Sequence, residues 1–186
     1  MTSLYIFAAV ALVAVAIIVL FNQLIAKRQM TNNGWADIDV QLKRRADLIP
    51  QLVTTVQAYA AHEKTLFEEV AEKRNAALAA GDNAAQRGEA ESALSKPVGR
   101  LIALAEAYPD LKANQNFLDL QNELSETENK IEMARRFYNG AVRDLNTAAE
   151  SFPSNLVAAI FGIKQRTFFE ITAADDRAVP DLGLTP

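Results

Sequence analysis

Apolar residues dominate the start of the chain and then recur at helical spacing through most of the remaining sequence. Residues 1–26 carry no charged side chain, and residues 4–21 form an unbroken apolar run. At 1.5 Å per helical residue, this run reaches roughly 27 Å, close to the hydrocarbon thickness of a bilayer. The pattern predicts a membrane span that includes Leu4, Ile6, Phe7, Val10, Leu12, Val15, Ile17, Ile18, Leu20 and Phe21.

Basic residues predict the orientation of this span. Lys27, Arg28 and residues 43–45 all lie after it, whereas no Lys or Arg precedes Leu4. The missing positive n-region favours an uncleaved anchor over a cleaved signal peptide. We expect a single-pass protein with its N-terminus outside and its body in the cytoplasm. A periplasmic body stays open as the alternative, because long domains can override the charge bias.

The body of the chain begins with a helical pattern that continues past a proline. Because Pro50 lies inside this pattern and has no N–H group, the helix either kinks there or a second helix starts there, with Asp47 as its cap. The pattern has apolar residues three and four apart, which predicts one buried face. That face carries Ile38, Leu42, Ile49, Leu52, Val56, Tyr59, Leu66 and Val70.

Two further helices come next. Residues 81–83 predict a stop and a restart, Pro97 predicts a bend or a late start, and residues 108–110 predict a turn. The helix after that turn has a heptad seam, which implies a supercoiled partner helix from this chain or from a second copy. Pro153 ends it, and a short apolar helix is expected over residues 155–161. The seam carries Phe117, Leu120, Leu124, Thr127, Ile131, Ala134, Tyr138, Ala141, Leu145, Ala148 and Phe152.

These patterns predict an all-α protein: an N-terminal transmembrane helix, then an antiparallel bundle of three to four long helices and a short C-terminal helix. The expected domains are an anchor at 1–26, a helical bundle at 27–172 and an irregular tail at 173–186. A net charge of -4 argues against a nucleic-acid surface, and the absence of cysteine excludes thiol chemistry and disulfides. We expect neither a cofactor nor a metal.

Several long blocks follow one another along the chain: Trp35 with Ile38 to Pro50, Tyr59 to Glu63, Leu104 to Asn114, Ala134 to Asn139, Ser151 to Asn155, and Phe168 to Glu170. In this order they resemble the LemA family. The resemblance implies a bacterial inner-membrane protein with one N-terminal span, a short outward terminus and an antiparallel helical bundle. A magnetosome-associated branch is similar too, and the family offers no catalytic residues to transfer. Pro97 departs from the small residue expected there.

The one histidine of the chain, His62, precedes Glu63 and so resembles the start of a zinc-protease motif. Position 66 is Leu66, so the second histidine of that motif is missing and zinc is not expected. The same run resembles the phosphoacceptor box of sensor kinases. A phosphotransfer role for His62 on a helical hairpin is therefore the alternative function.

Two charged residues, Arg45 and Glu63, fall on the apolar face of the first soluble helix. A buried unpaired charge costs several kcal/mol, so each would need an opposite charge. We expect a carboxylate beside Arg45 and an arginine, Arg135 or Arg136, beside Glu63. If the helix turns at Pro50 instead, both reach solvent.

A candidate partner surface surrounds the basic cluster after the anchor and comprises Lys43, Arg44, Asp47 and His62. The short helix at 155–161 is apolar enough to enter a membrane interface, although capping the bundle is the commoner use. Together these features predict a membrane-anchored scaffold or adaptor that binds proteins or self-associates. We expect it to have no catalytic activity of its own.

Overall fold

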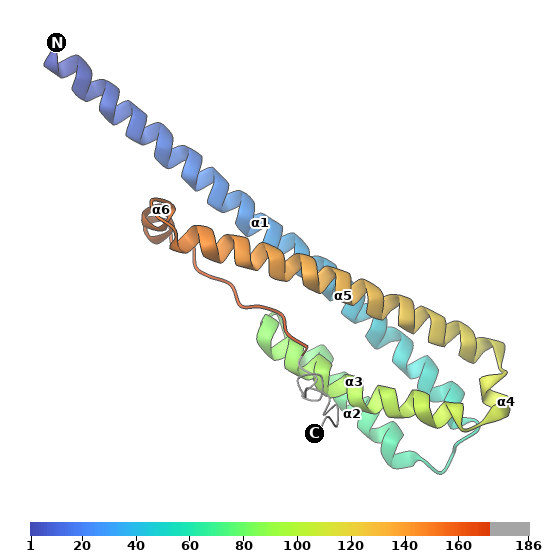
Figure 1. The fold of residues 1–186 in the computed structure, drawn as a ribbon. Helices are drawn as coiled ribbons and strands as arrows, with labels where there is room; N and C mark the ends of the chain where they lie inside the picture. Colours follow the sequence, from blue (N-terminus) through green and yellow to red (C-terminus); the bar gives the residue numbers. More distant parts are fainter. Residues whose placement is uncertain (172–186) are drawn as a thin grey trace, which may run out of the picture. The chain divides into compact units, whose positions relative to one another are not determined.

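The computed structural model describes residues 1–171, and within them the chain is helical with no strand (Figure 1). This confirms the all-α prediction, while the tail expected at 173–186 lies outside the described residues. In that range the helices are α1 (Thr2–Gln57), α2 (Lys64–Ala79), α3 (Ala84–Glu106), α4 (Pro109–Lys112), α5 (Gln115–Glu150) and α6 (Ser154–Ile160).

Helix α1 continues through Pro50 without restarting, so the second helix considered at this point does not form. Pro50 cannot donate to the carbonyl of Ala46, four residues earlier. Arg74 of α2 replaces the missing donor, since its Nε lies 2.5 Å from the Ala46 oxygen. A neighbouring helix therefore satisfies the carbonyl that the proline leaves open.

The first break after the anchor falls at residues 58–63, which the sequence pattern placed inside a helix. Tyr59 and His62 therefore lie in a loop, and Leu66 and Val70 belong to α2. The restart predicted at 81–83 is confirmed: Gly81 has a φ of 66°, and the Asn83 side chain accepts bonds from two N–H groups of α3. Pro97 lies inside α3, so no late start occurs there.

The seam of α5 is buried within the chain along most of its length, from Phe117 through Leu145. Phe152 is the exception, because α5 ends at Glu150 and the Phe152 side chain is 80% exposed. The partner of the seam therefore comes from this chain. Pro153 follows Phe152, and α6 begins directly after it at Ser154, as the sequence predicts.

The chain divides into two compact units. Unit 1 comprises Met1–Val40 and Ile131–Phe168, and unit 2 comprises Gln41–Lys130 together with the described residues that follow Phe168. Helices α1 and α5 contribute residues to both units. Helix α1 also runs without a break across residue 26, where the sequence predicted the end of the anchor.

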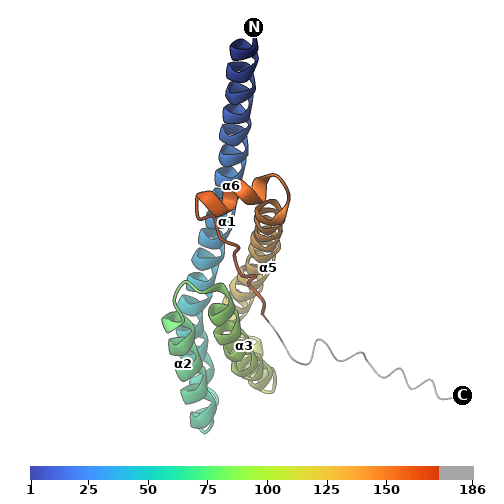
Figure 2. The same cartoon turned by 90° about the vertical axis from the view of Figure 1, so that its left-hand side faces the viewer.

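In unit 1, α1 and α5 pack antiparallel through small and aromatic residues. The rings of Trp35 and Tyr138 lie 5.5 Å apart, and a Cβ on Gly34 would meet the backbone of Tyr138 at 3.1 Å. Nearer the anchor, Leu24 packs with Leu145 of α5. Figure 2 shows α6 crosswise to α1 at that level.

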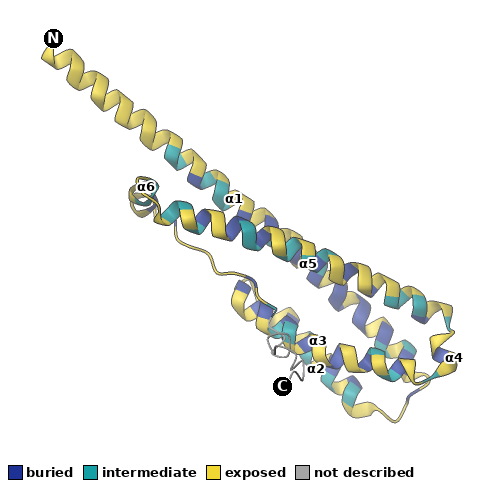
Figure 3. Ribbon diagram, viewed as in Figure 1, coloured by how far each residue is buried: buried dark blue, intermediate teal, exposed yellow. Residues whose placement is uncertain are grey.

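The apolar start of α1 has no neighbour among the described residues. Residues 1–19 are all exposed, and Figure 3 shows this part of the helix in the colour of exposed residues. In the described chain, α1 is the helix that is long and apolar enough to cross a membrane. The packed part of unit 1 begins at Leu20.

Candidate functional site

Unit 2 has a hydrophobic core formed by α1, α2, α3 and α5, and a charged side chain enters it. The core includes Ile49, Leu52, Val56, Phe67, Val70, Leu94, Leu101, Phe117 and Leu124. Arg45 lies one helical turn before Ile49 on the same face of α1, and its side chain is only 2% exposed. The core therefore has to accommodate a guanidinium group.

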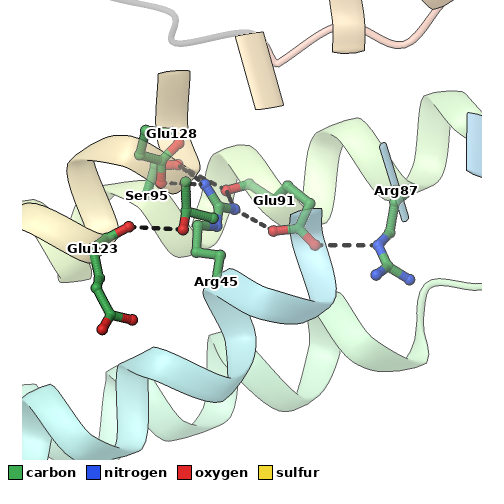
Figure 4. Close-up of polar contacts among 7 residues, drawn as sticks. Arg45, Arg87, Glu91, Ser95, Glu123 and Glu128 are labelled. Carbon is green, nitrogen blue, oxygen red and sulfur yellow. Dashed lines mark hydrogen bonds and ion pairs between the residues drawn. The ribbon is translucent and has the colours of Figure 1, made fainter. Parts of the chain in front are cut away.

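Arg45 meets two carboxylates, as its place on the buried face predicts (Figure 4). Its Nη2 is paired with the Glu91 carboxylate of α3, and its Nη1 lies 2.9 Å from Oε1 of Glu128 on α5. Nη1 also lies 3.5 Å from the Ser95 hydroxyl. One side chain thus connects α1 with both α3 and α5.

Helix α3 supplies the rest of the network from one face. Arg87 and Glu91 are four residues apart, which places them on neighbouring turns, and Arg87 Nε donates to Glu91 Oε1 at 3.1 Å. Both side chains are buried. The Glu91 carboxylate therefore lies between two guanidinium groups.

Among the described residues, the network contains two positive and two negative groups. Arg45 and Arg87 face Glu91 and Glu128, so two positive groups meet two negative ones. Burial by itself would lower the pKa of Arg45, but Glu128 and Glu91 outweigh it and hold that pKa above its ordinary value. Arg45 is therefore a fixed positive charge at any physiological pH.

A pocket of about 380 Å³ lies beside the network, between α1, α3 and α5. Arg45 and Glu128 form its charged side, and Val98, Ile102 and Leu124 form its apolar side. The Nε of Arg45 is buried and has no hydrogen-bond partner among the described residues. The site thus joins a buried charge to a small, mostly apolar space.

The arrangement supports a structural role better than a chemical one. The Ser95 hydroxyl donates to the Glu91 carbonyl at 3.0 Å, so a backbone acceptor rather than a general base receives its proton. Among the described residues, no group of three His, Asp or Glu side chains is placed to hold a metal ion. What the network can do is hold three helices in one register.

The second predicted pairing is wrong. Glu63 lies at the start of α2, where its side chain is exposed, because α1 has already ended at Gln57. Arg136 pairs instead with Glu132 on its own helix. The carboxylate of Glu132 consequently has a pKa below its ordinary value, through its hydrogen bond to Arg136 and the charge of that side chain.

The predicted partner surface consists of exposed residues, but His62 is not on a helix. Lys43 and Asp47 form an ion pair of 2.9 Å one turn apart, and Arg44 lies 3.8 Å from Glu123. His62 lies in the loop at 58–63, which corrects its expected place on a helical hairpin. The other three residues share the exposed side of α1.

Sequence reasoning missed Arg87, Glu91 and Glu128. A signal for two of them exists, because positions 87, 91, 94, 98 and 101 follow the same spacing of threes and fours as the apolar face of α3. Charged residues in that series indicate a buried pair. Glu128 has no such signal, since it comes directly after the buried seam position Thr127.

The fold places this chain in the class of all-helical bundle proteins, and its first helix carries an exposed apolar stretch. A model of the LemA family matches residues 34–183. The chain belongs to the LemA family, which confirms the resemblance seen in its sequence blocks.

Three curated proteins illustrate the relationship. Magnetosome protein MamQ 2 of Paramagnetospirillum magneticum is 23% identical in an alignment that covers 86% of this chain and 68% of that protein. Magnetosome protein MamQ of Magnetospirillum gryphiswaldense is 23% identical, over 77% of this chain and 62% of that protein. Protein LemA of Metamycoplasma hominis is 25% identical, over 74% and 63% respectively.

Proposed function

We propose that this protein is a membrane-anchored helical scaffold that presents the exposed side of α1 in unit 2 to protein partners. The observation that carries the proposal is the continuity of α1: an exposed apolar stretch leads directly into a packed bundle. The proposed function is therefore to hold a partner-binding surface at a membrane.

The apolar stretch supports the anchor. Leu4, Phe7 and Leu12 are 72%, 74% and 72% exposed, and fully burying one such side chain contributes about 1.5–3 kcal/mol. A lipid bilayer would provide that burial for the whole stretch. Lys27 and Arg28 come shortly after it and favour a cytoplasmic bundle with the N-terminus outside.

The buried network supports the scaffold. Arg45 joins three helices while its neighbours Lys43, Arg44 and Asp47 lie on the exposed side of the same helix. The internal contact thus fixes the outer surface. A partner with both positive and negative side chains would suit these residues, because Lys43 and Asp47 can separate from each other and form ion pairs with the partner instead.

Membrane insertion and orientation can be tested together, because the chain has no cysteine of its own. Asp82→Cys, in the loop between α2 and α3, would be treated with a membrane-impermeant maleimide in intact cells and after lysis. Carbonate extraction of the same membranes reports insertion. We expect an inserted protein labelled only after lysis. Labelling in intact cells contradicts the cytoplasmic orientation, and release by carbonate contradicts the anchor.

The partner surface can be tested by site-specific photocrosslinking in cells. A photoreactive amino acid would replace Lys43, with Glu89 on the exposed side of α3 as the matched control. We expect a discrete adduct from position 43 and none from position 89. Equal adduct patterns at both positions would argue against a partner surface on α1.

A further inference from the structure

Helix α6 lies at the level where the apolar stretch of α1 ends. The rings of Phe21 and Phe161 have centroids 4.5 Å apart, and Val157 and Ala158 pack in one cluster with Leu24. Figure 2 shows α6 crossing α1 at this level. If α1 crosses a bilayer, α6 therefore lies along the membrane surface.

The contact with α1 and α5 uses only one face of α6. Val157 and Ala158 are buried, whereas Leu156 is 55% exposed, Ile160 is 74% exposed and Phe152, just before the helix, is 80% exposed. Positions 152, 156 and 160 are four apart, so 156 and 160 share a helix face. The exposed apolar face of α6 therefore needs an apolar environment other than α1 and α5.

The charges around α6 indicate what that environment is. The sequence has no acidic residue at 1–36 or at 151–169, and its basic residues there are Lys27, Arg28, Lys164 and Arg166. Lys27 lies roughly 9 Å beyond Phe21 along the helix, about the depth of a headgroup layer. An apolar surface with a basic border matches the interface of an anionic leaflet.

We propose that α6, together with Phe152, inserts into the interfacial layer of the bilayer that α1 crosses. The apolar side chains of Phe152, Leu156 and Ile160 enter the boundary between acyl chains and headgroups, and Lys164 faces the lipid phosphates. Unit 1 is thereby seated on the membrane at two points, the span and the interfacial helix. This inference rests on the proposed anchor and adds a second lipid contact to it.

Nitroxide labels at single introduced cysteines test the insertion. The full-length protein would be reconstituted in vesicles of phosphatidylcholine with a minority of phosphatidylglycerol. Accessibility to oxygen, which concentrates in lipid, is compared with accessibility to a water-soluble nickel complex. Ile160→Cys is the test site, Met133→Cys on the exposed side of α5 is the aqueous control, and Val13→Cys reports the span itself.

We expect the ratio of oxygen to nickel accessibility at Ile160→Cys to exceed that at Met133→Cys by at least about threefold, with Val13→Cys higher still. A nickel-accessible label at position 160 with a lipid-exposed label at position 13 overturns the interfacial helix and leaves the anchor intact. A nickel-accessible label at position 13 overturns the anchor. Spin–spin broadening at position 160 identifies a contact between two copies, which also overturns the proposal.

Discussion

Unit 1 and unit 2 share the same two long helices but are stabilised by different contacts. Of the described residues, the buried charged ones are Arg45, Arg87 and Glu91, and all three belong to unit 2. In unit 1, Gly34 brings α1 close to α5, and Trp35 packs on Tyr138. The same two helices thus take part in close apolar packing in unit 1 and in buried ion pairs in unit 2.

The difference shows which contacts specify the register of the bundle. Apolar contacts are non-directional and tolerate small shifts, whereas a buried ion pair requires its partners at defined positions. Arg45 satisfies its charge only when α3 and α5 present Glu91 and Glu128 together. We therefore expect unit 2 to specify its helix register more strictly than unit 1, and substitutions in each unit can test this comparison.

The largest effect is expected from Arg45→Met. It leaves Glu91 buried with only Arg87 as a partner, and breaking such a pair costs about 3 kcal/mol of unfolding free energy. Thermal unfolding of the full-length protein in detergent would measure the loss, and hydrogen exchange should rise in α3 more than in α6. The matched control is Arg44→Met, whose side chain is 44% exposed. Equal losses for the two variants would contradict a special role for the network.

A smaller effect is expected from Gly88→Ala, also in unit 2. An added Cβ would collide with the backbone oxygen of Glu170, so the segment at Phe169 and Glu170 would have to move. Overpacking of this kind costs about 2 kcal/mol. Gly99→Ala is the control on the same helix, because a Cβ there meets nothing within 4 Å and alanine favours the helix. Unfolding midpoints that rise for both variants would show that the segment does not pack on Gly88.

Tyr138→Phe tests the neutral contacts of unit 1 and is expected to cost about 1 kcal/mol, because the Tyr138 hydroxyl donates to the Thr167 carbonyl at 2.9 Å. Tyr59→Phe, at an exposed hydroxyl of unit 2, is the control. Chemical unfolding of the three proteins at neutral pH would measure the difference. A loss no larger than that of Tyr59→Phe would contradict a stabilising hydrogen bond.

The same residue predicts a pH dependence. Burial raises the pKa of Tyr138, although the charge of Arg166 opposes the shift. The folded state then holds the phenol proton more tightly than the unfolded state, so stability falls as the pH rises above about 10. Tyr138→Phe should remove this part of the alkaline loss. Parallel stability curves for the wild type and the variant above that pH would contradict the shift.

The smallest effect is expected from Lys43→Ala. Its ion pair with Asp47 joins side chains that are 69% and 54% exposed, and such pairs contribute less than about 0.5 kcal/mol. Thermal unfolding should therefore change little, while crosslinking to a partner should weaken. Stability lowered as far as in Arg45→Met would place Lys43 in the network and contradict the division between inner and outer residues.

The sequence predicted the helices well where apolar periodicity was long and uninterrupted. Helix α5 and its seam are predictable from residues 117–145, and the restart before α3 is predictable from Gly81 and Asn83. Prediction was weaker where one residue was compatible with two different backbone structures. Pro50 permits a break or a continuous helix, and only the approach of Arg74 to the Ala46 carbonyl explains the continuous one.

The same limit applies to the candidate site. The place of Arg45 on an apolar face indicated a carboxylate partner, but a similar argument failed for Glu63 because α1 ends at Gln57, before that position. Phe152 failed for a related reason, since Pro153 and the end of α5 turn it out of the seam. Periodicity therefore predicts the face of a residue correctly only when the helix continues as far as that residue.

By itself, then, the sequence determined the apolar stretch, the helical class, the family blocks and the buried faces of α1 and α5, because these depend on composition and on spacing along one helix. Only the tertiary structure decided which residues meet across helices: Arg74 with Ala46, Arg45 with Glu91 and Glu128, and Phe161 with Phe21. Such contacts join positions far apart in the chain, and their pairing depends on helix ends and packing distances that local periodicity does not encode.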